Sequence, residues 1–357
     1  MSNNKILYFI HVPWKWIKQR PHFIAEELSQ NNEVTVAEIL PLDKKYRSKG
    51  VQTVTLRSYL QLPKDRIPII HSINKLLQRI QLRKYIHGAD LFWFTNPYQY
   101  SFFKRKDLKG RIVFDCMDDL PEFEPTMERR QKMEALEGRL YKEADLVIAS
   151  SLYLREKLFK RYGKRNVVVV NNAIKRMENI ETKPLPEEVK DKMPNGIFII
   201  SYIGTIEKWI DFNLVTDIVE NCPEVTFCFF GPLKTELPQH DRIKYCGMVP
   251  HDVVFSVMDN SDALIMPFVL NELILSVNPV KLYEYIYSGK PCIAPRYGES
   301  ESFGEYAYLY DSTEDCCQIV KKLIEGQGAK HTIDDCRSFA LSNTWKERVE
   351  QIEEALG

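Results

Sequence analysis

Short hydrophobic runs recur along the chain, and longer segments of mixed character separate them. The runs do not alternate between hydrophobic and polar residues, which indicates strands buried on both faces of a parallel sheet. Strands that alternate with helices predict a doubly wound α/β domain. In the first half of the chain we predict strands at residues 6–10, 34–39, 51–56, 91–95, 112–115, 146–149 and 167–170, and helices at 21–29, 127–143 and 152–162.

A second series of the same kind follows, and a charged segment with three prolines, residues 173–195, separates the two as the predicted linker. The predicted domains are therefore residues 1–172 and 196–340, with a terminal helical segment at 341–357. In the second series we predict strands at 197–203, 225–230, 243–246, 263–266 and 292–294, and helices at 212–220, 252–258, 280–287, 315–324 and 344–356. Two doubly wound Rossmann-like domains would hold a ligand at the carboxyl ends of their strands, facing across a cleft.

The net charge of zero hides an uneven distribution of charged residues. Residues 1–172 carry a balance of +12 and residues 173–357 a balance of −12. A basic first half favours an anionic partner, either lipid or acceptor, and the alternative is two solvated surfaces of different composition. Residues 70–86 are basic and amphipathic, so they could lie on an anionic membrane or pack on the sheet with a solvated basic face.

The eight cysteines show no C-x-x-C spacing, and three of them, Cys116, Cys228 and Cys292, lie in or beside predicted strands. Buried thiols are therefore expected rather than disulfides or a zinc site. The first residues resemble a buried strand more than a signal peptide, and the hydrophobic runs at 6–12 and 263–269 are too short to span a membrane. We expect a cytoplasmic protein, with a peripheral position on the inner face of the membrane as a further expectation.

Several common sites are missing from the sequence. There is no G-x-G-x-x-G after the first predicted strand, no G-x-x-x-x-G-K-[ST], and no G-x-S-x-G. The seven histidines lack metal-ligand spacing. These absences argue against dinucleotide, P-loop and esterase chemistry and leave nucleotide-sugar chemistry, for which we expect no metal, no cofactor and no nucleic-acid partner.

Residues 276–294 carry the most specific pattern. Pro279 suits the start of a helix, and Gly289 suits the left-handed residue after its end. The first amide groups of this helix, at Val280, Lys281 and Leu282, form a predicted anion site together with the Lys281 ammonium group. One turn further along, the Glu284 carboxylate can bind a sugar diol, so the segment predicts a site for a nucleotide sugar.

Four blocks of the second half match one family in order: residues 201–211, 229–232, 264–272 and the Pro-x-Lys-x-Tyr-Glu-Tyr block that begins at Pro279. The first half adds Gln-Arg-Pro-His at 19–22 and Phe-Asp-Cys-Met-Asp-Asp at 114–119. The chain resembles the retaining GT-B-fold nucleotide-sugar glycosyltransferases, in the bacterial surface-polysaccharide branch of teichuronic-acid and capsule type. That resemblance covers nearly the whole chain and implies that the terminal helix crosses back to the first domain.

The resemblance implies a donor site in the second domain. Glu284 would bind the ribose hydroxyls, and Lys281 with its neighbouring amides would bind the diphosphate. Gly204 and Thr205 would lie against the phosphates. At Gly204 the backbone would approach the phosphates more closely than a side chain permits. The further donor-binding positions are Lys208, Gly231, Met248, Val249, Asn278, Val280 and Leu282.

The sequence departs from the family at two places. Many members carry an arginine and, a few residues later, a lysine that bind the diphosphate, and this chain has Thr205 and Ile210 near those places. Lys208 could substitute, with Lys281 as the other cation. Ser276 stands where the first of two glutamates is usual, and Glu272 is the nearest acid upstream. Glu272 could contact the donor sugar as a catalytic residue, or it could be an exposed loop acid.

In the first domain, Asp118 and Asp119 follow a predicted buried strand. They are the predicted catalytic acids, which would orient an acceptor hydroxyl or take its proton, and the alternative is a helix N-cap. The predicted acceptor-binding residues lie near the first strand and are His11, Trp14, Trp16 and Arg20. The alternative for them is a loop that packs on its own domain.

Taken together, the residues and the resemblance predict a hexosyltransferase-type glycosyltransferase. It would move a sugar from a nucleotide donor, expected to be UDP-linked, to a hydroxyl of a glycan or lipid-linked glycan, with retention of configuration. Two alternatives stay open: a nucleotide-sugar epimerase of the same architecture, and a non-catalytic glycan-binding protein with a degenerate donor site.

Overall fold

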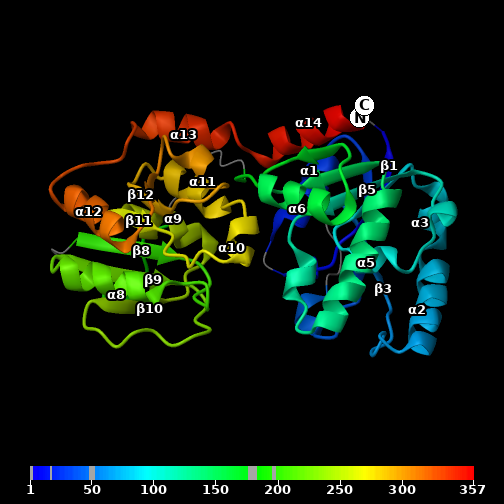
Figure 1. Ribbon diagram of the computed structural model, residues 1–357, viewed down its shortest axis with the longest axis horizontal. Helices are drawn as coiled ribbons and strands as arrows, with labels where there is room; N and C mark the ends of the chain where they lie inside the picture. The colour runs from blue at the N-terminus through cyan, green and yellow to red at the C-terminus, as the bar shows by residue number, and fades with distance from the viewer. Residues whose placement is uncertain (1–2, 17, 48–52, 176–182, 195–197) are drawn as a thin grey trace. The chain divides into compact units, whose positions relative to one another are not determined.

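The computed structural model describes residues 3–16, 18–47, 53–175, 183–194 and 198–357. The chain forms two compact units, each built around a parallel sheet (Figure 1). Unit 1 consists of Met1–Ala173 and Trp345–Gly357, and unit 2 consists of Ile174–Thr344. Because the last helix belongs to unit 1, the chain passes between the units twice.

The sheet of unit 1 has seven parallel strands in the order β3-β2-β1-β4-β5-β6-β7. The strands are β1 (Lys5–Phe9), β2 (Glu33–Ile39), β3 (Thr55–Tyr59), β4 (Leu91–Phe94), β5 (Arg111–Cys116), β6 (Leu146–Ala149) and β7 (Val167–Val169). The strand order reverses between β1 and β4, which is where doubly wound sheets bind their ligands. Every residue of β4 and of β6 is buried, as the hydrophobic runs predicted.

Helices cover both faces of this sheet. Along β1, Leu7 and Phe9 face one core, and Ile6 and Tyr8 face the other. The helices are α1 (Arg20–Leu28), α2 (Pro68–Gln81), α3 (Arg83–Gly88), α4 (Pro97–Tyr100), α5 (Met127–Glu143), α6 (Leu152–Tyr162) and α14 (Trp345–Leu356), with short 3-10 helices η1 (Lys44–Tyr46), η2 (Arg105–Asp107) and η3 (Leu120–Phe123). On one face α14 packs against α1, with the Trp345 ring stacked on Phe23 at 5.4 Å.

The sheet of unit 2 has six parallel strands in the order β10-β9-β8-β11-β12-β13. The strands are β8 (Phe198–Ile203), β9 (Val225–Phe230), β10 (Ile243–Gly247), β11 (Ala263–Ile265), β12 (Cys292–Pro295) and β13 (Tyr308–Tyr310). The helices are α7 (Glu187–Lys190), α8 (Phe212–Asn221), α9 (Val254–Asp259), α10 (Glu272–Ser276), α11 (Val280–Tyr287), α12 (Thr313–Ile324) and α13 (Ile333–Leu341), with η4 (His251–Val253) and η5 (Glu301–Phe303). The predicted fold class of two doubly wound α/β domains is confirmed.

Some predicted elements differ from the structure. The third strand lies at Thr55–Tyr59 rather than 51–56, because Tyr59 is the residue that enters the core; residues 51 and 52 lie outside the described part. Strand β13 was not predicted, since three residues give too short a hydrophobic run. In the predicted linker, Leu185, Val189 and Met193 are buried in the core of unit 2, so the described part of that segment belongs to a folded unit.

The described residues hold no group of three or more His, Cys, Asp or Glu side chains placed to bind a metal ion. All eight cysteines are buried thiols. Among the described helices, none combines the length and the hydrophobicity that crossing a bilayer would require.

Candidate donor and acceptor sites

Two glycines meet where β8 and β9 end in unit 2. The Gly204 amide donates a hydrogen bond to the Phe230 carbonyl oxygen at 2.8 Å. Gly231 has φ +127°, and a Cβ there would lie 2.2 Å from the Gly204 carbonyl oxygen. A Cβ on Gly204 would lie 2.6 Å from Cε of Lys281. The two loops therefore touch through backbone alone, and the Lys281 side chain lies against them.

Helix α11 is fixed to the end of β8. The Tyr285 hydroxyl accepts a hydrogen bond from the Ile203 amide at 3.0 Å. Pro279 occupies the N-cap position, and Gly289 after the helix has φ +75°, which confirms both predicted ends. This attachment holds the first turn of α11, and with it Lys281, beside Gly204.

Lys281 and Glu284 share one face of α11, one turn apart. Burial lowers the pKa of the Lys281 ammonium group, and the Glu284 carboxylate opposes that shift by favouring the charged form. A cation in this position gains from an anionic ligand, because the negative charge of the ligand would compensate for the hydration that the buried ammonium group has lost. The pair is suited to a diphosphate next to a diol.

Leu282 does not fit its predicted donor-binding role. Its amide donates to the Pro279 carbonyl oxygen at 3.1 Å, and its side chain is fully buried in the core. The amides of Val280 and Lys281, which precede that bond, are the ones suited to an anion.

The remaining predicted donor-binding residues differ in burial and in hydrogen bonding. The Thr205 carbonyl oxygen accepts a hydrogen bond from the Tyr202 hydroxyl at 3.0 Å, which fixes the turn after Gly204. Lys208 and Met248 are exposed, and Val249 packs partly on the core. The structure brings Gly204, Gly231 and Lys281 together by direct contact. For Thr205, Lys208, Met248 and Val249, contact with the donor stays a prediction.

Asn278 has a partner that the sequence did not reveal. Its side-chain amide donates to a Glu299 carboxylate oxygen at 3.4 Å, and both residues are buried. Glu299 follows the carboxyl end of β12, so a signal existed: a polar loop directly after a buried strand. Glu299 holds the loop that leads into α11.

The acids expected before α11 have separate surroundings. Glu272 is exposed at the first position of α10, whose N-cap is Asn271. Ser276 is buried, and its hydroxyl donates to the Leu273 carbonyl oxygen at 2.7 Å. A contact between Glu272 and the donor sugar stays a prediction.

In unit 1, His11 lies at the reversal of strand order. Its Nδ1 is 2.8 Å from Oγ1 of Thr95, and that hydroxyl donates to the Phe9 carbonyl oxygen at 3.0 Å. Because the Thr95 hydrogen is used, Nδ1 of His11 must carry the hydrogen of the pair, and Nε2 is left as an acceptor. Burial, with a smaller effect from His22, lowers the pKa of His11 to about 4, so the ring is neutral near pH 7.

The adjacent Asp118 and Asp119 differ sharply. Burial raises the pKa of the Asp118 carboxyl to about 7, with Arg20 opposing the shift and Asp115 and Asp119 adding to it. Asp119 is 1% exposed and forms ion pairs at 2.6 Å with both Arg161 and Lys157. Asp118 is therefore suited to accept a proton near neutral pH, whereas Asp119 is held in a charge cluster. Asp119 occupies the N-cap position of η3, as the alternative predicted, but its side chain makes no capping hydrogen bond.

Two predicted acceptor-binding residues are structural instead. Trp14 is 6% exposed within the core, and its amide donates to Glu38 Oε2 at 2.7 Å. The Arg20 guanidinium is buried against Asp115, at 2.9 Å, and donates to the Val170 carbonyl oxygen at 2.8 Å. The predicted roles of Trp14 and Arg20 are wrong because both side chains point into unit 1. The acceptor contacts of His11 and of Trp16, which is 42% exposed, stay predictions.

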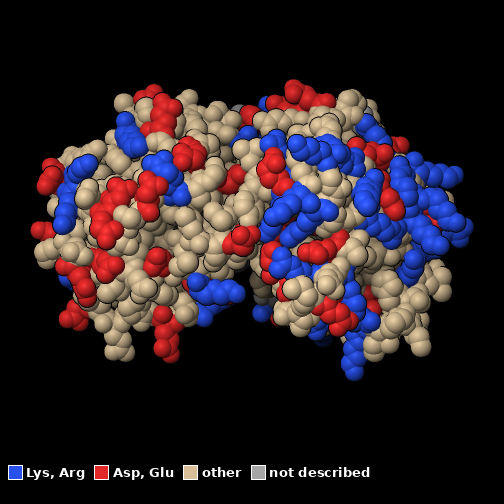
Figure 2. All heavy atoms as spheres, in the orientation of Figure 1, with Lys and Arg blue, Asp and Glu red and all other residues tan. Residues whose placement is uncertain are grey.

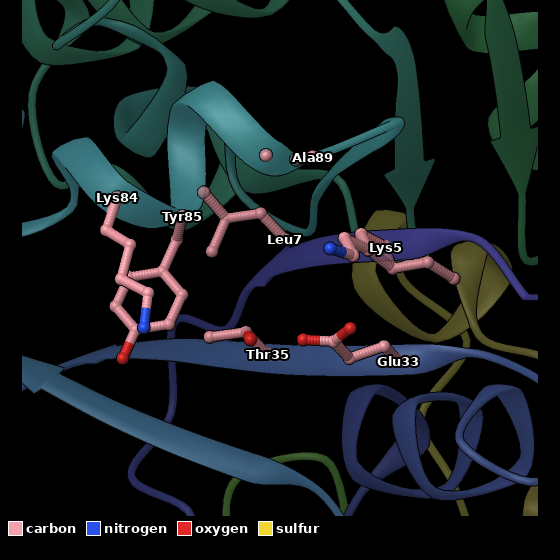
Figure 3. A pocket seen from close by; sticks show the side chains of 9 residues that line it. Lys5, Leu7, Glu33, Thr35, Lys84, Tyr85 and Ala89 are labelled. Carbon is pink, nitrogen blue, oxygen red and sulfur yellow. The ribbon is translucent and has the colours of Figure 1, made fainter.

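A pocket elsewhere in unit 1 lies under α3. Lys84 and Tyr85 extend from α3 toward β2, and Lys5, Glu33 and Thr35 line the same pocket from β1 and β2 (Figure 3). Lys5 and Glu33 begin their strands, so this pocket lies at the amino ends of the sheet. It is therefore separate from the carboxyl-end residues that carry the predicted chemistry.

Comparison with known proteins supports the assignment of the fold. No protein-family model matches the chain. A protein of Bacillus subtilis (strain 168), provisionally named as the teichuronic acid biosynthesis glycosyltransferase TuaH, is 25% identical over 98% of this chain and 97% of its own length. The crystal structure of Anabaena HepE in complex with UDP is similar with a TM-score of 0.73 and 17% identity, over 99% of each chain.

A second solved structure agrees. Sucrose-phosphate synthase from Thermosynechococcus elongatus matches with a TM-score of 0.63 and 12% identity, over 97% of this chain and 94% of its own. The two parallel-sheet units, the full-length relative and these structures identify the chain as a glycosyltransferase with the GT-B fold.

Proposed function

We propose that this glycosyltransferase moves a sugar from a UDP-linked donor to a hydroxyl of a glycan or lipid-linked glycan in surface-polysaccharide synthesis, with retention of configuration. The contact among Gly204, Gly231 and Lys281, with Glu284 one turn further along α11, is the observation that carries the proposal. HepE, which shares the fold, was solved in complex with UDP and with UDP-glucose. The B. subtilis relative is named for teichuronic acid biosynthesis.

On the donor side, the amides of Val280 and Lys281 and the Lys281 ammonium group bind the diphosphate. Glu284 accepts hydrogen bonds from the ribose hydroxyls. As the bond between the anomeric carbon and the diphosphate oxygen breaks, negative charge grows on the leaving UDP. Lys281 and the helix amides stabilise that charge, which lowers the barrier without a metal ion in this proposal.

On the acceptor side, the attacking hydroxyl oxygen forms the new bond to the anomeric carbon and loses its proton. Asp118, whose pKa is raised to about 7, accepts that proton or the hydrogen bond that precedes its transfer. Nε2 of neutral His11 accepts a hydrogen bond from a second sugar hydroxyl. The basic first half of the chain supports an acceptor held at an anionic membrane surface, on the inner face.

Calorimetric titration of the full chain with UDP and with GDP tests the donor assignment. We expect UDP to bind and Glu284→Gln to weaken binding by about tenfold or more, since hydrogen bonds to a charged group are lost. Glu314→Gln, an exposed acid in the first turn of α12, is the matched control and should bind as the parent does. A folded protein that binds neither nucleotide would refute the proposal. A protein that binds only GDP would refute the assignment of uracil as the base of the donor nucleotide.

Transfer is tested separately from binding. Mass spectrometry of a reaction with a UDP-sugar and a glycan acceptor should show an acceptor that has gained one sugar, and free UDP. Release of an epimerised sugar without acceptor would support the epimerase alternative instead. UDP binding with neither product would support the non-catalytic alternative.

A further inference from the structure

Helix α2 presents hydrophobic side chains to solvent. Ile69, Ile73, Leu76 and Ile80 follow a helical spacing that places them on one face. Their side chains are 73%, 43%, 60% and 63% exposed, respectively. Ile67, just before the helix, is also exposed, at 45%. A contiguous hydrophobic stripe of this kind marks an interaction surface rather than scattered surface residues.

The opposite face of α2 is polar and buried. Asn74 and Gln78 are 0% and 1% exposed. The Asn74 side chain accepts from the Leu62 amide at 2.8 Å and donates to the Leu62 carbonyl oxygen at 3.0 Å. Gln78 donates to the Gln61 side chain at 3.2 Å. The helix is thus attached to unit 1 by hydrogen bonds, and the predicted alternative of a solvated basic face over a buried hydrophobic one is wrong for α2.

Positive charge borders the stripe. Lys75 and Arg79 lie on α2 beside it. A pocket at the junction with α3 is lined by the polar residues Arg79, Arg83, His87 and Asp107 and by the hydrophobic residues Ile80, Ile86 and Phe103. Figure 2 shows Lys and Arg side chains gathered over α3, next to a largely uncharged surface over α2. Arg79 pairs with Asp107, so Arg83 is the further cation of the pocket. Nδ1 of His87 lies 2.8 Å from the Arg83 carbonyl oxygen, and the His87 ring is a hydrogen-bonding group of the pocket.

The cations near α2 repel one another. Burial lowers the pKa of Lys75, and the positive charges of Arg79, Lys104 and Arg139 lower it further, while the Asp107 carboxylate opposes the shift. Such a local excess of positive charge is relieved by a polyanionic surface. The hydrophobic stripe favours a partner with a hydrophobic interior, and the neighbouring cations favour a partner with an anionic surface.

We propose that α2 lies flat on an anionic phospholipid bilayer, with Ile69, Ile73, Leu76 and Ile80 among the upper acyl chains and the pocket of Arg79, Arg83 and His87 holding a lipid phosphate. Its 14 residues are too few to span a bilayer and suit an in-plane helix. A second copy of the chain fits less well, because the same cations would face each other. The proposal rests on the proposed function in one respect: the enzyme would bind its lipid-linked acceptor at this membrane surface.

Sedimentation with vesicles tests the proposal on the full chain without donor or acceptor. We expect binding to phosphatidylglycerol–phosphatidylcholine vesicles and little binding to phosphatidylcholine alone. Leu76→Ser/Ile80→Ser should reduce binding at least tenfold, since two buried hydrocarbon side chains are lost. Arg83→Gln should reduce it about fivefold, which is the contribution of one cation near an anionic surface. Leu152→Ser, an exposed leucine at the start of α6, is the matched control and should bind normally.

The outcomes separate this proposal from the assigned activity. UDP calorimetry on each variant reports whether unit 2 and the donor site are intact. Absence of vesicle binding by a folded, UDP-binding protein would overturn the membrane proposal alone. Equal vesicle binding by Leu76→Ser/Ile80→Ser and the parent would also overturn it, as would a lipid-free dimer in ultracentrifugation that the same variant dissociates. Lost UDP binding with retained vesicle binding would instead refute only the donor site.

Discussion

The Gly204 carbonyl oxygen occupies the space beside Gly231 that any side chain at residue 231 would need, 2.2 Å from the position of a Cβ. Gly231 also has φ +127°, a conformation that residues with side chains rarely adopt. Two neighbouring strand ends are therefore held closer than side chains would permit. The Lys281 side chain packs against the same backbone, so the geometry of the donor site depends on both glycines.

Gly231→Ala should disrupt this contact. We expect a loss of about 1–3 kcal/mol in unfolding free energy, from the clash and the strained φ, and a marked loss of UDP affinity. Thermal unfolding and calorimetry measure the two effects. Gly326→Ala is the control, because Gly326 has φ +101° but nothing within 4 Å of its Cβ position. Equal behaviour of the two variants would show that the clash with Gly204 is unimportant.

Lys281→Met should separate stability from ligand binding. Burial lowers the pKa of Lys281, so the folded state disfavours its charge. That group's contribution to stability therefore rises with pH between its lowered folded pKa and its ordinary unfolded pKa. At pH 7 we expect Lys281→Met to unfold at the same or a higher temperature without ligand, and to bind UDP about 10- to 100-fold more weakly. Retained UDP affinity would exclude Lys281 from the diphosphate site.

Asp118→Asn should change the pH dependence of both stability and activity. The pKa of Asp118 is raised to about 7, so the folded state holds a proton that the unfolded state releases near pH 4. Stability from this group is complete below pH 4 and is lost as pH rises through 7. The variant should therefore melt higher than the parent at pH 8.5 but similarly at pH 4. In a transfer assay, the parent should lose activity below about pH 7 and the variant should be nearly inactive throughout.

Asp119→Ala should behave as a stability variant. Asp119 pairs with Arg161 and Lys157 in a cluster that also holds Glu122 and Glu137, so removing it takes away the shortest ion pair of both cations but leaves them other acidic partners. We expect a loss of about 1.5–3 kcal/mol in unfolding free energy, the value of a lost hydrogen bond to a charged group, measured by urea denaturation. Asp118→Asn serves as the control at the neighbouring position. A fully stable but inactive Asp119→Ala would assign Asp119 a direct catalytic contact instead.

Helix ends were predictable because local chemistry sets them. The predicted helix at 152–162 is bounded by Ser151, whose side chain accepts from the Leu154 amide, and by Gly163 at φ +90°. The predicted helix at 280–287 ends before Gly289 in the same way. Both boundaries depend on residues within one turn, so the sequence contains the full signal.

Partners that lie far apart in the chain could not be predicted in the same way. Asp118 and Asp119 look alike in sequence, and Arg161 on α6 distinguishes them only after folding. The hydrophobic face of α2 was evident, but the hydrogen bonds between Asn74 and Leu62 determine which face is buried. The acceptor roles predicted for Trp14 and Arg20 failed for the same reason. Glu38 accepts a hydrogen bond from the Trp14 backbone amide, and Asp115 pairs with the buried Arg20 guanidinium.

The position of α14 in unit 1 has a consequence for synthesis of the chain. Residues 345–357 emerge from the ribosome after unit 2, yet Trp345, Val349 and Ile352 complete the core on the α1 face of the first sheet. Unit 2 is a continuous segment that can fold as soon as it has emerged. Although translation of unit 1 begins first, part of the α1 face of its sheet stays uncovered until α14 has followed unit 2. The unit that starts first therefore finishes folding after the second.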